Sequence, residues 1–474
     1  MQYISSKKDR GRFDFFLMVS LAVLALNFFS QAMAFPVQCL LLIYSVVKSD
    51  IRLFPGMFLL MLDKSNFPSL EGVAIKVHIG FALSPQNVFL IACFAVCLSG
   101  LFRRWYDNRT SIWILFWLLC IIPALAMALP AKREGLAAVW QNPIVQFLTP
   151  SLYFWGIGVA KTWDKGQDYF VSRMILILTV VNVLSFFNEF YIFTFAEHIT
   201  MISLFVGAVI MRVGSAARII GAIGALFALA NVLFARYMRL EKEVGFAGEA
   251  EVGSTFTRVM VVIIGVSLIA YFASKHKNAG VVRKIPYVAL IICSIVLFYA
   301  VGRARSSSMS DTVSKEYQNI FERFEYKLVG DRGSVWNAGM EEVFRAPYFI
   351  KNLKDQMDMV YDYQTGMFVL GIRLLPHNQV LTLLGRSGWW EGLFMILFLW
   401  WTHTKAFNAA ADMLWDKTLL CVLLSTSAAV FIAVGLTGQT VLSHLFCSNG
   451  LVTMVFPGMI YGVWRNRRMI YRGR

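Results

Sequence analysis

The sequence predicts an all-α polytopic membrane protein with about 14 transmembrane helices and one large periplasmic loop that is itself helical. Apolar residues occupy 58% of the 474 positions, charged residues only 15%, and the mean hydropathy is +0.62. Apolar runs of about 15 to 22 residues follow one another along the chain, close to the ~20 residues that a helix needs to cross a ~30 Å hydrocarbon layer. The runs do not alternate apolar with polar residues, which indicates helices and not barrel strands. We expect residues 1–474 to form a single transmembrane domain.

The first two spans are expected back to back. Four basic residues precede the run at 13–34, which ends in Ala32-Met33-Ala34 as a signal-peptidase site would. Hydrophobicity resumes at once at 36–47, so we interpret both runs as spans and not as a cleaved signal. The run at 51–62 is short for a span, and a re-entrant segment is the alternative. Further spans are expected at 87–102, 111–129, 144–161, 174–195, 199–212, 219–236, 257–274, 286–302, 379–402, 418–436 and 445–464.

The charges are sorted between the two sides of this arrangement. With the N-terminus inside, the inner segments carry 25 Lys or Arg and 8 acids, whereas the outer segments carry 19 and 20; together these are the 44 basic and 28 acidic residues of the chain. This asymmetry follows the positive-inside rule and predicts a multi-pass membrane protein with both termini in the cytoplasm. The net charge of +16 therefore indicates contact with membrane lipids that have anionic headgroups, and no nucleic-acid partner is expected.

Two polar loops are expected on the periplasmic face. The larger loop, residues 303–377, carries ten basic and ten acidic residues, so it is not a basic arm for nucleic acid. Trp336 and several other aromatic residues give it enough apolar side chain for a small folded unit. The smaller loop is residues 237–256. These loops and the membrane edge beneath them hold the polar groups that we consider for function.

Arginine is the first group of candidates. Guanidinium groups bind phosphate bidentately and stay protonated, which suits an anionic headgroup or a pyrophosphate. Pairing with the twenty outer acids is the structural alternative for each arginine. The two that follow residue 302 have no acid nearby in sequence until Asp311, which favours a binding role for them. The arginines in or near the two loops include Arg236, Arg239, Arg303, Arg305, Arg332 and Arg373.

His377 is the second candidate, because a neutral imidazole is a suitable general base near pH 7. It follows Pro376 where the chain re-enters the membrane, and a purely structural role at a helix start is the alternative. Glu189 is an acid in or near a span, either functional or at a helix end that reaches water. The seven cysteines and the outer acids do not form a metal-ligand pattern, so we expect neither a metal nor another cofactor.

The order of motifs in the large loop resembles a known family. Arg332 and Trp336 stand near the middle of the loop, and Pro347 follows. His377-Asn378 then enters the next span, which carries Gly385. The motifs are Gly330-Asp331-Arg332-Gly333-Ser334-Val335-Trp336, Phe344-Arg345-Ala346-Pro347, Pro376-His377-Asn378-Gln379 and Leu384-Gly385-Arg386-Ser387-Gly388. They resemble the C-terminal signature of the O-antigen ligase and Wzy-type O-antigen polymerase superfamily, over about residues 236–392.

The resemblance implies an inverting, metal-independent glycosyltransferase of the bacterial inner membrane, acting on the periplasmic face. The donor would be an oligosaccharide on undecaprenyl pyrophosphate, and the acceptor of a polymerase a second lipid-linked repeat unit. The first alternative is a ligase that transfers the glycan to lipid A core, and the second is a lipid-linked oligosaccharide flippase or transporter. A chain-length regulator protein is a further expected partner. His377 and Arg332 would be catalytic, and the substrate would be bound by Arg303, Arg305, Arg239, Arg236, Arg373 and Trp336.

Overall fold

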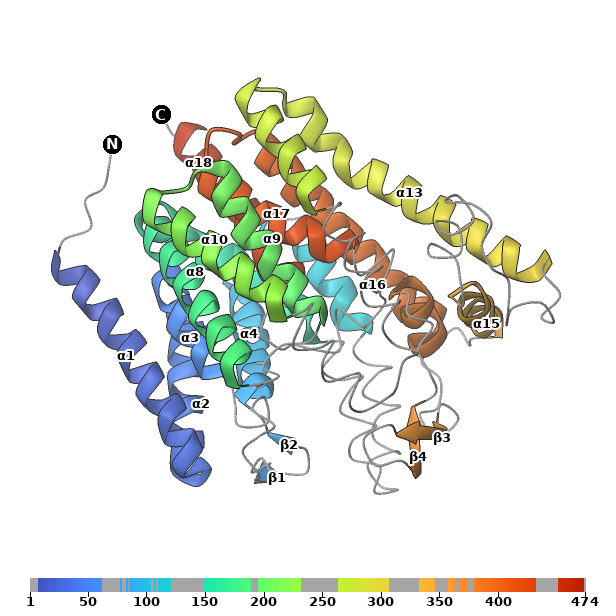
Figure 1. Ribbon diagram of the computed structural model, residues 1–474, viewed down its shortest axis with the longest axis horizontal. Helices are drawn as coiled ribbons and strands as arrows, with labels where there is room; N and C mark the ends of the chain where they lie inside the picture. The colour runs from blue at the N-terminus through green and yellow to red at the C-terminus, as the bar shows by residue number, and fades with distance from the viewer. Residues whose placement is uncertain are drawn as a thin grey trace.

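The chain folds mostly into helices, with two short antiparallel β ladders. A computed structural model describes residues 7–61, 77–78, 82–83, 85–103, 106–107, 110–120, 148–188, 195–231, 263–306, 332–345, 357–362, 367–372, 379–431 and 451–472. In Figure 1 the start of α1 (Lys7–Phe29) and helix α18 (Phe456–Arg472) lie toward one end of the molecule, whereas α15 (Arg332–Arg345) lies toward the other. The helical character predicted from the sequence is confirmed for the described bundle.

The N-terminal helices form a packed pair, but their boundary differs from the expected one. The chain breaks at Ser30, whose extended backbone (φ −151°, ψ 99°) separates α1 from α2 (Gln31–Lys48). We expected the break near residue 35, before Pro36. Pro36 instead lies inside α2 as its sixth residue, where its missing N–H removes one intrahelical hydrogen bond without ending the helix.

The third expected span is a short buried helix. Residues Ile51–Leu53 form a 3-10 turn (η1) that continues into α3 (Phe54–Met61), and every residue of α3 is buried. Eleven helical residues reach only ~16 Å, about half the thickness of the hydrocarbon layer. Gly56 permits this burial, because a Cβ there would lie 2.7 Å from the ring of Phe16. The apolar helix expected at 51–62 is present, and its length fits the re-entrant alternative better than a full span.

The longest apolar helical segment of the described chain joins three consecutive elements. It comprises α7 (Pro150–Val159), the 3-10 turn η3 (Ala160–Thr162) and α8 (Trp163–Asn188). Within the described residues, its part Pro150–Leu184 is the one helix long and apolar enough to cross a membrane. The other apolar helices found there are shorter: Ala32–Lys48, Ile51–Met61, Asn87–Phe102, Thr110–Cys120, Met201–Met211, Ser215–Ala230 and Ile263–Lys275. The inner loop expected between spans 144–161 and 174–195 is helical.

Glycines allow α18 to approach α7 at backbone contact distance. A Cβ on Gly458 would overlap the carbonyl oxygen of Tyr153 and lie 3.0 Å from its carbonyl carbon. One turn later, a Cβ on Gly462 would lie 2.6 Å from the Cβ of Ala160. This Gly-x-x-x-Gly spacing is typical of closely packed transmembrane helix pairs.

Three further helices complete this side of the bundle. Helix α10 (Ser215–Ala230) packs on α8 and on α9 (Phe195–Met211), and α9 packs on α17 (Lys417–Phe431). A buried amide pair marks the contact between α8 and the end of α10, where Asn231 Nδ2 donates to the carbonyl oxygen of Asn182 at 2.9 Å. Helix α4 (Pro85–Phe102), expected at 87–102, packs on α2 and α7.

The large loop contains a β hairpin as well as a helix. Strands β3 (Met357–Asp362) and β4 (Met367–Ile372) pair antiparallel, with Met357 opposite Ile372. The expectation of a purely helical loop is wrong here, since the Met-Asp-Met-Val-Tyr-Asp sequence of β3 largely alternates apolar and polar residues. A second, shorter ladder joins β1 (Val77–His78) to β2 (Ala82–Leu83).

Candidate functional site

Three helices converge where the large loop meets the bundle. Helix α15 packs against both α13 (Ala279–Ser306) and α16 (Gln379–Ala411). The indole Nε1 of Trp389 on α16 donates a hydrogen bond to the carbonyl oxygen of Val343 on α15 at 3.1 Å, and Val343 itself is buried. Figure 1 shows α15 beside the end of α13 that lies away from α1 and α18. Segments about 75 residues apart in sequence thus meet at one end of the molecule.

The convergence brings together the elements that carry four predicted site residues. Arg303 and Arg305 lie in the last turn of α13, Arg332 is the first residue of α15, and Trp336 follows one turn later. The start of α15 carries the positive end of its helix dipole, which favours an anion nearby. The end of α13 carries the negative end of its dipole, which stabilises cations. The two arginines on α13 therefore have a structural explanation beside the binding one.

The other predicted residues lie outside the described residues. His377 is two positions before the start of α16, and Arg373 is one position after the end of β4. Arg236 and Arg239 also lie outside the described chain, as does Glu189. For these positions the function remains a prediction.

The structure adds one buried acid that the sequence interpretation missed. Helix α16 is broken at Gly388, whose backbone (φ 79°, ψ 172°) lies where residues with a Cβ are strained. Three residues later, Glu391 is completely buried. It lies within electrostatic range of the Cys120 thiol at the end of helix Thr110–Cys120.

The signal for Glu391 was present in the sequence. It is the only acid in the apolar run at 379–402, and an acid inside such a run suggests a functional site. The aromatic residues beside it fix the position of the helix, because the ring of Trp390 packs 5.4 Å from that of Phe116 and Trp389 bonds to α15. A carboxyl group held there can bind a proton or hydrogen-bond a hydroxyl group.

No protein-family model and no curated protein matches the chain. The functional argument therefore depends on residue types and their placement. Among the described residues, no group of three or more His, Cys, Asp or Glu side chains could hold a metal ion. The candidate groups are the predicted arginines, the predicted imidazole of His377 and the buried carboxyl group of Glu391.

The opposite end of the bundle holds a second polar cluster. Asp416 accepts hydrogen bonds from Arg467 at 3.0 Å, from the indole of Trp163 at 3.3 Å and from the backbone N–H of Leu419 at 3.0 Å. Arg467 also pairs with Asp164. Burial lowers the pKa of Arg467, but the hydrogen bonds and charges of the two aspartates outweigh it, and the net effect is a raised pKa. This cluster links α8, α17 and α18.

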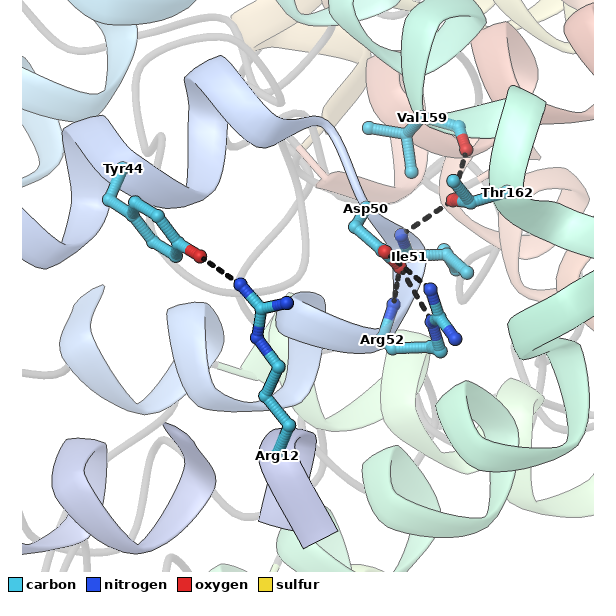
Figure 2. Close-up of polar contacts among 7 residues, drawn as sticks. All are labelled: Arg12, Tyr44, Asp50, Ile51, Arg52, Val159 and Thr162. Carbon is cyan, nitrogen blue, oxygen red and sulfur yellow. Dashed lines mark hydrogen bonds and ion pairs between the residues drawn. The ribbon is translucent and has the colours of Figure 1, made fainter. Parts of the chain in front are cut away.

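A related set of contacts joins the N-terminal helices to this end. Figure 2 shows Asp50 accepting hydrogen bonds from the backbone N–H and the guanidinium of Arg52, at 2.8 to 3.0 Å. The preceding backbone N–H, that of Ile51, donates to the hydroxyl of Thr162 at 2.9 Å. Arg12 on α1 reaches the hydroxyl of Tyr44 on α2. These contacts hold neighbouring elements of the fold together, and none of their residues was predicted to bind substrate.

Proposed function

We propose that this protein is a bacterial polysaccharide polymerase of the O-antigen type. It would transfer a glycan from undecaprenyl pyrophosphate to a second lipid-linked repeat unit on the periplasmic face. The observation that supports this most directly is the convergence of α13, α15 and α16. It brings together the helices that carry Arg303, Arg305 and Arg332, with α16 starting two residues after His377.

The proposed topology is the fourteen-span arrangement with both termini in the cytoplasm, in which the short segment at 51–62 is counted as one crossing. Interhelical polar contacts support it, since they join segments expected on the same inner side. Arg465 pairs with Asp107 at 3.8 Å, and the hydroxyl of Ser274 donates to the carbonyl oxygen of Leu414 at 2.7 Å. Alternation is kept after the short α3, because α4 is ~27 Å long and ends five residues before Asp107.

The topology can be tested by labelling single cysteines with a membrane-impermeant maleimide. Cysteines in place of Ser314 and of Arg474 should label from opposite sides of the membrane. Labelling of both from the same side would contradict the topology and the periplasmic reaction built on it.

In the proposed reaction, a hydroxyl oxygen of the acceptor sugar attacks the anomeric carbon of the donor. The bond from that carbon to the pyrophosphate oxygen breaks with inversion, and the hydroxyl proton passes to His377. Undecaprenyl pyrophosphate leaves with its negative charge stabilised by the arginines, which need no metal ion for this role. A positioned base supplies ~10²–10⁴-fold in such steps.

The test is reconstitution of the purified protein with its lipid-linked repeat unit. The expected product is a ladder of longer glycans on undecaprenyl pyrophosphate, formed without added metal ions. His377→Gln should retain donor binding and give little polymer, whereas a structural role would leave polymer nearly unchanged between pH 6 and 8. Glycan transferred to added lipid A core, with no ladder on the carrier lipid, would identify a ligase and refute the polymerase proposal.

A further inference from the structure

A cavity of about 650 Å³ lies at the end of the bundle that carries the Arg467–Asp416 cluster. It is bounded by the end of helix Ile263–Lys275, the start of α13 and the segment between α16 and α17. Its volume is within the ~300–1,000 Å³ that small-ligand sites occupy.

The lining of this cavity is positively charged. Lys275, Lys277 and Lys417 all contribute to it, and none of them forms an ion pair with an acid among the described residues. The one acid in the lining, Asp412, is paired with Arg283 at 2.5 Å and accepts a hydrogen bond from the indole of Trp464. Asp412 is thus already neutralised, and the three lysine charges remain uncompensated.

Two helices also begin at the cavity wall. Ala279 is the first residue of α13 and Lys417 the first residue of α17, and both line the cavity. The N-terminal end of a helix favours negative charge. Asp416 already caps α17, but α13 has no acid in its first turn. The helix dipole of α13 therefore adds to the field of the lysines.

We propose that this cavity binds a phosphate group, supplied by the headgroup of an anionic phospholipid. The surfaces next to it favour a lipid over a soluble anion. Trp415 lines the cavity and is 68% exposed, and an amphipathic indole is typical of the membrane interface. Exposed apolar side chains continue from it along two helices, including Phe272 and Leu268 on one and Val288 and Ile291 on α13. The acyl chains would lie along these faces, with the headgroup among the lysines.

The experiment uses the full-length protein purified in a neutral detergent. Native mass spectrometry would count bound dioleoyl phosphatidylglycerol and dioleoyl phosphatidylcholine. Inorganic phosphate would be tested separately by thermal stabilisation. The variant replaces Lys275, Lys277 and Lys417 by Gln. The control variant removes the same charge from Lys48, Lys165 and Lys284, which do not line the cavity.

Each lysine near an anionic headgroup contributes about fivefold in affinity. We therefore expect phosphatidylglycerol to bind at least ~10-fold more weakly to the cavity variant than to the wild type, with the control variant close to the wild type. A second outcome is that inorganic phosphate stabilises the wild type but not the cavity variant, and that phosphatidylglycerol is not preferred over phosphatidylcholine. This result would support a phosphate site in the cavity, but it would show that the ligand is a soluble anion and not a lipid. Equal binding of the two lipids, or equal loss in both variants, would overturn the proposal. Because polymer formation does not enter the readout, this failure would leave the proposed transfer reaction untouched.

Discussion

The close contact between α7 and α18 gives a sharp test of the packing. In Gly458→Ala, the new methyl group would overlap the carbonyl oxygen of Tyr153, and backbone atoms cannot move aside as a flexible side chain can. The helices would have to separate, and overpacking of this kind costs ~1–3 kcal/mol. Alanine regains about 1 kcal/mol of helix propensity over glycine. Because the overlap is with backbone, the upper part of that range, ~2–3 kcal/mol, applies, and the free energy of unfolding should fall by about 1–2 kcal/mol after the gain in propensity.

Gly265→Ala is the matched control, because nothing lies within 4 Å of the position where its Cβ would be placed. It has the same gain in helix propensity without the overlap, so its stability should be unchanged or slightly higher. The two variants should then differ by about 2 kcal/mol, which corresponds to a difference in Tm on the order of 2–5 °C.

Thermal unfolding can be followed in detergent with a maleimide that fluoresces on reaction with thiols. Cys93, Cys97 and Cys421 are free and buried, so they react only as the bundle opens. A Tm for Gly458→Ala equal to that of the wild type would refute the close approach of α7 and α18. An equal loss in Gly265→Ala would show that the assay does not report this contact.

Three further predictions concern charged groups. Asp416→Ala should destabilise the protein by about 3 kcal/mol in the same thermal assay, because it removes the buried partner of Arg467, whose side chain is only 14% exposed. Asp164→Ala, at an aspartate that is 61% exposed, should change stability by less than ~1 kcal/mol. Arg332→Lys and Arg305→Lys should each lose at least ~10-fold in polymer formation, since lysine cannot reproduce the guanidinium fork. Unchanged polymer length in the double variant would exclude these two arginines from the pyrophosphate site. Glu391→Gln should fold, with an unchanged Tm, and lose polymer formation in the reconstituted assay; normal polymer would assign this buried carboxyl group to packing alone.

The helices of this chain were predictable because long apolar runs report helix positions directly. Helix α4 was expected at 87–102 and is found at Pro85–Phe102. The break at Ser30 was not predictable, because nothing in its side chain requires an extended backbone, whereas Pro36 gives a strong but misleading signal. Burial of α3 was not predictable either, since an eleven-residue apolar run looks the same whether it faces lipid or protein.

The candidate site was predictable only in part, for a different physical reason. Motif spacing suggests which residues belong together, but it does not state which helices meet. The contact of α15 with α13 and α16 depends on tertiary packing, of which the Trp389 bond to Val343 is one element. Glu391 could have been found from sequence as the one acid in its apolar run. The hairpin of β3 and β4 was missed because each strand has only six residues, and the wholly apolar sequence of β4 does not distinguish a strand from a helix.

The two ends of the bundle should respond differently to substitution. At one end, the three bonds of Asp416 and the glycine contacts of α18 hold several helices at close distance. At the other end, α15 is joined to the bundle by a short helix interface, and α16 is broken at Gly388. Under the proposed function, substrates of changing length must enter and leave at that second end. We therefore expect substitutions near Asp416 to lower Tm in proportion to any loss of activity. Substitutions near Gly388 should lower activity with little change in Tm, and the opposite pattern would argue against a site at the α13–α15–α16 convergence.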